Sequence, residues 1–282
     1  MKLFSWNTAK RLNKLPKQAE FINNYHPDIV ALQEVIPSTE AAFRKLLKPK
    51  YPFMVSSFQL ADDLSLLQNK RMFGQLIASK FEMEALNPKL FNLPWPERVL
   101  SVSVNLGEAK CDVHTTHIPP GSSNGWTKIE MINGIIDFFA NRHDNFQILC
   151  GDFNTPQKED KENGVITFGQ RIKSNQSAVV RNKFRGGLGR NWDAAERSLF
   201  ERLNCLGLED MFRKLHPNDF NAYSWQFKRK DKIFKTRFDH IFADKRLEFI
   251  NCMYLNNQGD LSDHSPILGK FSIPKLKSPH AS

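Results

Sequence analysis

The amino-acid sequence predicts an α+β protein in which two β-sheets pack face to face and helices cover their outer faces. Short β-type segments far outnumber helix-like segments, and two of them within residues 99–118 follow each other closely enough to form an antiparallel pair. The helix-like segments are distributed among the strands without a regular one-to-one alternation. This distribution argues against a βαβ barrel and favours two packed sheets flanked by helices.

The predicted strands are short segments rich in apolar residues, several with alternating apolar and polar positions. Between residues 99 and 106, Val102 and Val104 alternate with Ser101 and Ser103, which is typical of a half-buried strand. We expect strands at 2–7, 28–35, 73–80, 99–106, 111–118, 147–154, 238–243 and 267–272. We expect helices at 17–25, 39–47, 128–141 and 193–206.

Two segments interrupt this pattern and are strongly basic. Residues 171–190 contain six Lys or Arg residues, no acidic residue and a glycine cluster, which predicts a flexible basic loop. Residues 228–237 contain six further Lys or Arg residues against the single Asp231. The chain after Pro274 predicts a flexible tail, so we expect one domain over 1–274 and a tail over 275–282.

The composition is that of a soluble protein with a polyanionic partner. Of the 282 residues, 40% are hydrophobic and 25% are charged, which excludes a disordered chain. The formal net charge of +10 favours binding to phosphate-rich molecules, because Lys and Arg release counterions when they neutralise phosphates. We therefore expect a nucleic-acid partner and no membrane partner.

The cysteines and the start of the chain predict where the protein resides. Cys111, Cys150, Cys205 and Cys252 form no CxxC pair, so neither a zinc site nor a disulfide scaffold is predicted. The first residues already have the pattern of a strand, and no apolar segment approaches the length of a membrane span. We expect a soluble, intracellular and cytoplasmic protein, with a nuclear location left open, that acts as a monomer.

The polar residues of most interest lie at the ends of predicted strands. A carboxylate such as Glu34, which follows an apolar strand, is costly to desolvate unless a cation or hydrogen-bond donors meet it. Repetition of this feature across several strands predicts one assembled site. The side chains concerned are Asn7, Glu34, His117, Asp152, Asn154, Asp239, Asp263 and His264.

The residue types in this set indicate a particular chemistry. Carboxylates and an amide without cysteine are hard oxygen ligands, which suit Mg²⁺ or Mn²⁺. Phosphoryl transfer also needs a group that deprotonates water and donors that stabilise the oxyanion. Glu34, Asp152, Asn154 and His264 provide these functions.

The same residues lie in six short motifs, SWN, LQEV, THIPPG, GDFNTP, RFDHIF and LSDHSPI. In order and spacing these motifs resemble those of the endonuclease/exonuclease/phosphatase superfamily, from Asn7 to Ile267. The most specific pair is GDFN followed much later by SDHxPI. The resemblance implies a four-layer αββα sandwich of two packed mixed sheets flanked by helices, with the site at one edge.

The resemblance also implies a role for each matched residue. Glu34 resembles the metal ligand, Asn7 assists on the metal side, and Asp263 matches a further acidic position near the metal. Asp152 resembles the residue that activates the attacking water, and Asn154 the one that steadies the phosphate. His264 resembles the histidine that contacts the scissile phosphate, held in its tautomer by Asp239, and His117 occupies a position where a phosphate contact is expected.

The segment from Trp192 to Phe238 resembles the exonuclease III and abasic-site endonuclease branch, which favours DNA over RNA. Two positions depart from that branch: Val35 and Ile36 follow Glu34 in place of Thr-Lys, and Thr236 stands where an aromatic residue lines the abasic pocket. We therefore predict a Mg²⁺- or Mn²⁺-dependent DNA endonuclease or 3′ exonuclease, with abasic-site activity and a repair role left open. The basic residues expected to contact nucleic acid are Lys228, Arg229, Lys230 and Arg237.

Other interpretations stay open at this point. The same chemistry could act on RNA or on a small or lipid phosphate ester, because fold does not determine function. A non-catalytic nucleic-acid-binding protein on the same scaffold is a further alternative. Each residue also has a structural interpretation, with Asn7 as a helix cap, Asp152 and Asn154 as turn formers, and the histidines as core residues.

Overall fold

Two six-stranded mixed sheets form the centre of the protein in this computed structural model, which describes residues 1–141, 143–229 and 232–274. The first sheet has the strand order β19-β20-β1-β2-β4-β3, and the second has the order β15-β18-β8-β7-β6-β5. Within each sheet one central pair is parallel, β1 with β2 and β7 with β8. The predicted fold class is confirmed. The first sheet consists of β1 (Lys2–Asn7), β2 (Ile29–Val35), β3 (Phe53–Ser56), β4 (Gly74–Ser79), β19 (Glu248–Tyr254) and β20 (Ile267–Ser272).

The second sheet contains the antiparallel pair that was predicted within residues 99–118. β6 pairs with β7 over seven residues, from Val99 opposite Thr116 to Asn105 opposite Lys110. All eight predicted strands are present, and the short outer strands β3, β5 and β15 and the long β19 were not predicted. The second sheet consists of β5 (Met83–Ala85), β6 (Val99–Asn105), β7 (Lys110–His117), β8 (Phe146–Asp152), β15 (Leu208–Asp210) and β18 (Asp239–Asp244).

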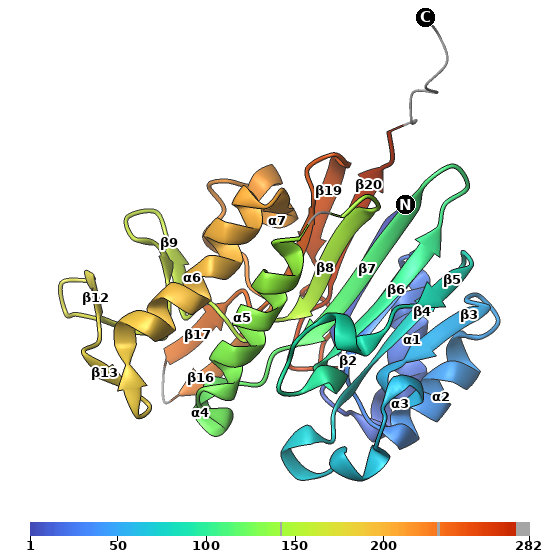
Figure 1. Ribbon diagram of the computed structural model, residues 1–282, viewed down its shortest axis with the longest axis horizontal. Coiled ribbons are helices and arrows are strands. Elements are labelled where there is room, and N and C mark those ends of the chain that lie inside the picture. The colour runs from blue at the N-terminus through green and yellow to red at the C-terminus, as the bar shows by residue number, and fades with distance from the viewer. Residues whose placement is uncertain (142, 230–231, 275–282) are drawn as a thin grey trace, which may run out of the picture.

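Helices cover the outer face of each sheet, so the arrangement has four layers. Helices α1 (Leu15–Asn24) and α2 (Pro37–Leu47) pack on the first sheet, and α5 (Thr127–Phe139) and α6 (Gly189–Cys205) pack on the second, as Figure 1 shows. These are the four predicted helices. Shorter helices are α3 (Ser57–Leu60), α4 (Gly121–Asn124) and α7 (Met211–Leu215), with 3-10 turns at Leu12–Lys14, Leu64–Leu66, Asn69–Arg71, Pro88–Leu90 and Pro96–Arg98.

The alternation of side chains along the strands builds three apolar layers. In β1, Leu3 points between the sheets, whereas Phe4 and Trp6 point to α1 and α2. In β8, Ile148 points between the sheets, whereas Leu149 points to α5 and α6. Each fully buried Leu, Ile or Phe contributes roughly 1.5–3 kcal/mol. The buried sheets thus provide a rigid frame whose inner faces end at a common edge.

Two predictions, one for the strand at 99–106 and one for residues 171–190, were wrong. Strand β6 is buried on both faces over all but its last residue, because the face that carries Ser101 and Ser103 is covered as well. Residues 171–190 do not form an irregular loop but two small hairpins packed against α6, in which backbone pairing satisfies groups that a loop would leave to water. The hairpins are β11 (Gln170–Ile172) with β12 (Ala178–Val180), and β13 (Lys183–Phe184) with β14 (Gly187–Leu188).

Two further hairpins lie beside the edge of the second sheet. The first joins β9 (Lys158–Asp160) and β10 (Gly164–Ile166), and the second joins β16 (Trp225–Arg229) and β17 (Lys232–Thr236). Figure 1 shows both on the side of the molecule where α6 lies. The predicted tail over 275–282 falls outside the described residues. Among the described residues, no helix is both long and apolar enough to span a lipid bilayer.

Candidate active site

Four of the predicted site residues lie on the inner faces of the two sheets, at the same edge. Asp152 continues the inner-face series of Ile148 and Cys150 along β8. Its neighbours across the sheet are His117 on β7 and Asp239 on β18. Asn7 occupies the corresponding inner position at the end of β1. Strand alternation therefore brings these four side chains together where the apolar inner layer ends.

Glu34 reaches the same place by leaving the regular geometry of its strand. Strict alternation along β2 would direct it toward α1 and α2, on the same face as Val30 and Leu32. Instead the register with β4 shifts between Leu32 and Val35, and Glu34 has a left-handed backbone with φ of 54°. Such a conformation costs a non-glycine residue roughly 1–3 kcal/mol and persists where surrounding structure holds it. This backbone conformation directs the Glu34 carboxylate into the site.

Asn7 and Asn154 hold the two carboxylates in place. The amide Nδ2 of Asn7 donates to Glu34 Oε1 at 3.1 Å and to Asp152 Oδ2 at 2.9 Å, and its Oδ1 accepts from the Ala9 backbone N–H. Asn154, also left-handed with φ of 51°, donates its backbone N–H to Asp152 Oδ1 at 2.8 Å. Its side chain donates to the carbonyl of Ile118 at 2.9 Å and lies 3.3 Å from Asp152 Oδ2. Asp152 is thus oriented by both asparagines.

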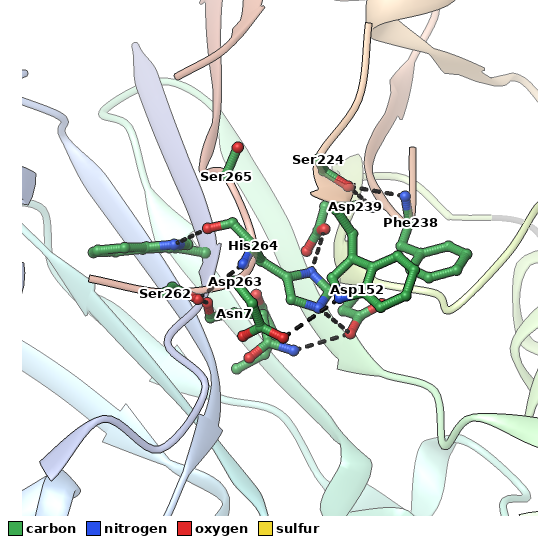
Figure 2. A network of polar contacts seen from close by, with 12 residues as sticks. Asn7, Asp152, Ser224, Phe238, Asp239, Ser262, Asp263, His264 and Ser265 are labelled. Carbon is green, nitrogen blue, oxygen red and sulfur yellow. Dashed lines mark hydrogen bonds and ion pairs between the residues drawn. The ribbon is translucent and has the colours of Figure 1, made fainter. Parts of the chain in front are cut away.

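His264 lies between two buried carboxylates, as Figure 2 shows. Its Nδ1 donates to Asp239 Oδ2 at 2.8 Å, and its Nε2 is 3.8 Å from Asp152 Oδ2. Its backbone is fastened at two points, since Ser262 Oγ accepts from its N–H and the Trp6 indole donates to its carbonyl. The imidazole is therefore fixed in place with a hydrogen on Nδ1.

Burial changes the pKa of two carboxylates of the site and of His264. The pKa of Asp152 is raised to about 7, chiefly by burial; the charge of His264 opposes the rise and the charge of Asp239 adds to it. Burial also raises the pKa of Glu34. For His264, burial opposes protonation, but the charges of Asp239 and Asp152 outweigh it and raise the pKa to about 10. His264 is therefore a cation at neutral pH, and the remaining negative charge favours a bound metal ion.

The donor set fits a hard divalent cation. Glu34, His117 and Asp152 each offer a ligand atom within 4.8 Å of the others, and so do Asp152, Asp239 and His264. The two imidazoles are poor candidates for ligands, because His264 is protonated and His117 is held by an arginine. Asp239 is bonded to His264, so oxygen atoms of Glu34 and Asp152 are the candidate ligands, which suit Mg²⁺ or Mn²⁺. Asn7 turns its amide nitrogen, not its oxygen, to these carboxylates.

Arg98 is a site residue that the sequence did not reveal. It is the last residue of the Pro96–Arg98 turn, is 2% exposed, and places Nη1 2.6 Å from Nδ1 of His117. A guanidinium can only donate, so Nδ1 must accept and the imidazole hydrogen must be on Nε2. Burial, followed by the charges of Arg98 and His264, lowers the pKa of His117 well below its ordinary value. His117 therefore offers a neutral Nε2–H, 3.6 Å from Glu34 Oε1 and 3.8 Å from Asp152 Oδ2.

Replacement of Arg98 by Met will release His117 into either tautomer and lower turnover about 10–100-fold, the usual effect of losing a partner that orients a site histidine. We expect the loss in kcat with little change in KM, because Arg98 is buried and acts through His117. Imidazole nitrogen chemical shifts in ¹⁵N-labelled protein will show His117 leaving the Nε2–H form. Arg98→Lys, which keeps a donor, should recover part of the turnover. An unchanged His117 tautomer in Arg98→Met would contradict this assignment.

Lys128 is a second residue that was missed, although the sequence carried a signal. It lies on the buried face of α5, in helical spacing with Met131, Ile132 and Ile135, where a lysine is unusual. Its ammonium donates to the backbone carbonyl of Asn154 at 2.7 Å and to the carboxylate of Glu196 on α6. This buried ion pair supports the turn that holds Asn154 and Asp152.

The remaining predicted residues lie outside the group of side chains that forms the site. Asp263 is half exposed, near Arg11 and the Trp225 indole, and outside both ligand groups, although its charge contributes to the raised pKa of Glu34. Arg237 is contrary to expectation: it is 2% exposed and paired with Glu159 and Asp210. An arginine buried between these two carboxylates joins the β9–β10 hairpin to β15 of the second sheet and is not available to nucleic acid, so its predicted role was wrong. Lys230 lies outside the described residues, as do the side chains of Lys228 and Arg229.

The geometry agrees with a family identified by sequence comparison. The sequence profile described as the Endonuclease/Exonuclease/phosphatase family matches residues 4–264. Exodeoxyribonuclease III of Haemophilus influenzae is 24% identical over 297 residues, covering 96% of this chain and 100% of the relative.

Solved structures share the fold. An AP endonuclease from Archaeoglobus fulgidus superposes with a TM-score of 0.66 at 20% identity, covering 97% of this chain and 100% of that one. TDP2 of D. rerio, in complex with a single-strand DNA product, superposes with a TM-score of 0.63 at 16% identity, covering 96% and 98%. At these identities the likeness is one of fold.

Proposed function

Because this chain belongs to the endonuclease/exonuclease/phosphatase family, we propose that it is a metal-dependent hydrolase that cleaves phosphodiester bonds in DNA. One observation carries the proposal. Asp152, 1% exposed, receives hydrogen bonds from Asn7 and Asn154 and lies within 3.8 Å of both His117 and His264. A carboxylate with a raised pKa, surrounded by donors aimed at one small volume, suits a base that acts on water next to a phosphate.

In this mechanism Asp152 accepts a proton from the attacking water, which then bonds to the phosphorus as the bond to the leaving oxygen breaks. His264, protonated and held by Asp239, donates from Nε2 to a phosphate oxygen and offsets the developing negative charge. Asn154 can turn the amide hydrogen that now points to Asp152, across an Nδ2 to Oδ2 distance of 3.3 Å, to the same group. His117 adds a neutral Nε2–H donor from the opposite side.

Glu34 and Asp152 are the residues that would hold the metal ion, with Asn7 keeping the two carboxylates apart and oriented. When bound, Mg²⁺ or Mn²⁺ supplies Lewis-acid stabilisation of the phosphate and its leaving oxygen. The strained backbone of Glu34 fits this role, because the strain has no evident purpose for packing. Asp263 is near enough to contribute an outer negative charge.

DNA is the substrate that we propose, acted on by a monomer inside the cell. The related exodeoxyribonuclease and the neighbouring AP endonuclease and DNA-bound TDP2 structures support it, as does the net charge of +10. The four cysteines are free thiols, in keeping with a reducing compartment. Abasic-site cleavage is included in the proposal, with Thr236 as the departure that a substrate comparison must address: it is buried and bonded to the carbonyl of Pro156.

A substrate panel with and without metal tests this function. End-labelled duplex DNA with and without an abasic site, single-stranded DNA and RNA are incubated in Mg²⁺, in Mn²⁺ and in EDTA. We expect cleavage of DNA in Mg²⁺ or Mn²⁺ and none in EDTA, because Glu34 and Asp152 lack a neutralising cation without the metal. Cleavage of RNA alone would move the substrate to RNA. Intact DNA and RNA under all conditions would refute the nuclease and direct the search to small or lipid phosphate esters.

A further inference from the structure

Four aromatic side chains stack in a row along the β16–β17 hairpin. The ring of Phe238 stacks on Trp225 at a centroid distance of 5.2 Å, Trp225 on Phe227 at 5.4 Å, and Phe227 on Phe234 at 5.2 Å. The angles between successive ring planes are 29°, 27° and 20°. We call Phe238, Trp225, Phe227 and Phe234 the aromatic row.

The inner end of the aromatic row belongs to the candidate active site. Phe238 precedes Asp239, and Trp225 forms a β-bridge with His264 while its indole lies 3.4 Å from Asp263 Oδ2. A cavity of ≈ 410 Å³ is lined by Phe238, Trp225 and Phe227 together with Asn154. The row therefore leads directly from the residues proposed to act on the phosphate.

The outer end of the row is in solvent. Phe227 is 40% exposed and Phe234 is 47% exposed, which is costly for two adjacent rings on a narrow hairpin. They are directly opposite in the antiparallel register, so part of their role is to stabilise the hairpin. Hairpin stability alone does not explain why the stack continues through Trp225 to Phe238 at the catalytic edge. A stacked and partly exposed series of rings is suited to a planar ligand.

Charge around the row indicates the kind of ligand. Arg185 lines the same cavity, and Lys232 is exposed on β17, two residues from Phe234 and on the same face of the strand. Positive side chains beside a line of aromatic rings match the two chemical parts of a nucleic-acid strand, phosphates and bases. In a paired duplex the faces of interior bases are already stacked on one another, so only unpaired bases can lie on the rings.

We propose that the aromatic row is a stacking platform for the unpaired bases of single-stranded nucleic acid, which it leads into the active site. This inference rests on the proposed function, which identifies the site that the strand enters as a site of cleavage. It assigns a single-stranded or frayed end, rather than an intact duplex, as the preferred substrate. Stacking is tolerant of base identity, so little sequence preference is expected. The rings contact bases and not the sugar, so the platform does not distinguish DNA from RNA. Strands of both kinds are therefore tested.

Equilibrium binding measured in EDTA tests the platform without requiring hydrolysis. Fluorescein-labelled single-stranded DNA, single-stranded RNA and blunt duplex DNA of the same sequence are titrated at one salt concentration. We expect the double variant Phe227→Ala/Phe234→Ala to bind single strands at least about ten-fold more weakly, as expected when two stacking rings are lost. Duplex binding should change less than two-fold, because it depends on phosphate contacts.

Matched variants separate stacking from hairpin stability. Ile233→Ala removes an apolar side chain that is 61% exposed on the opposite face of the same hairpin, and it should bind single strands like the wild type. Phe227→Leu/Phe234→Leu keeps apolar packing across the strands without rings, and it should show most of the loss seen for alanine. Phe227→Tyr/Phe234→Tyr should restore binding. Unchanged far-ultraviolet circular dichroism and duplex affinity will show that each variant is folded.

Several outcomes would overturn the platform. Equal loss of duplex and single-strand affinity, wild-type affinity in the double alanine variant, or no single-strand binding by the wild type would each do so. A dimer that the alanine variant abolishes, with single-strand affinity unchanged, would assign the rings to a second copy of the chain. Ring-dependent binding without any cleavage in Mg²⁺ or Mn²⁺ would refute the proposed hydrolase while leaving the platform in place.

Discussion

Asp152→Asn is expected to lower the rate of DNA cleavage by about 10³-fold, because the substitution removes the base that deprotonates water. Asparagine has nearly the same shape as aspartate and can still accept the backbone hydrogen bond from Asn154. The loss of rate will therefore reflect lost proton acceptance and lost charge. Single-turnover cleavage of end-labelled DNA at saturating Mg²⁺ measures it.

Binding and a surface control distinguish this effect from unfolding. DNA affinity in EDTA should be equal to or higher than that of the wild type, because a buried negative charge next to the phosphate site is gone. Asp137→Asn makes the same chemical change at an exposed position on α5 and should cleave at the wild-type rate. Turnover by Asp152→Asn within ten-fold of the wild type would exclude Asp152 as the base.

Glu34→Gln should remove the response of the protein to metal, with cleavage reduced about 100-fold or more at ordinary Mg²⁺ concentrations. The carboxylate that meets the cation becomes a neutral amide, so Mn²⁺ should no longer raise the melting temperature of the protein. Without metal, the variant should be at least as stable as the wild type, because burial raises the pKa of Glu34 and so disfavours its charged form. Thermal unfolding in EDTA and across a Mn²⁺ titration measures both effects.

The exposed Glu130 on α5 provides the matched control. Glu130→Gln should keep the full Mn²⁺-dependent rise in melting temperature, which follows from binding of the ion to the folded state alone. Recovery of wild-type cleavage by Glu34→Gln at the same Mg²⁺ concentration would show that Glu34 is not a ligand. A normal Mn²⁺ response together with lost cleavage would instead give Glu34 a role in chemistry.

The regular part of the architecture and most of the site followed from local pattern. Strand periodicity located all eight predicted strands, and helical spacing located the four long helices. The convergence of Asn7, His117, Asp152 and Asp239 also followed, because residues at the ends of neighbouring strands meet at one edge and a period of two determines which face they occupy. These features depend on short-range geometry that a sequence displays directly.

Features that depend on distant partners could not be predicted in this way. The hydrogen bond from Arg98 to His117 joins residues 19 apart on different elements, and nothing near Arg98 in the sequence indicates it. Arg237, by contrast, stands in a basic run that suggested a solvent-exposed nucleic-acid contact. Glu159 and Asp210 come from remote segments and bury it. The pairing of charges is decided by the packing of hairpins, which local composition does not report.

The sequence by itself thus determined the two-sheet class, the residue types of the candidate site and their placement at strand ends. Only the tertiary structure decided the strained turn that brings Glu34 inward, the tautomer of His117, the hydrogen-bond partner of His264, and the aromatic row beside them. The physical reason is the distance along the chain over which each interaction acts. Strand and helix periods are set by neighbouring residues, whereas strain, tautomer and stacking are set by contacts between segments that meet only in the folded chain.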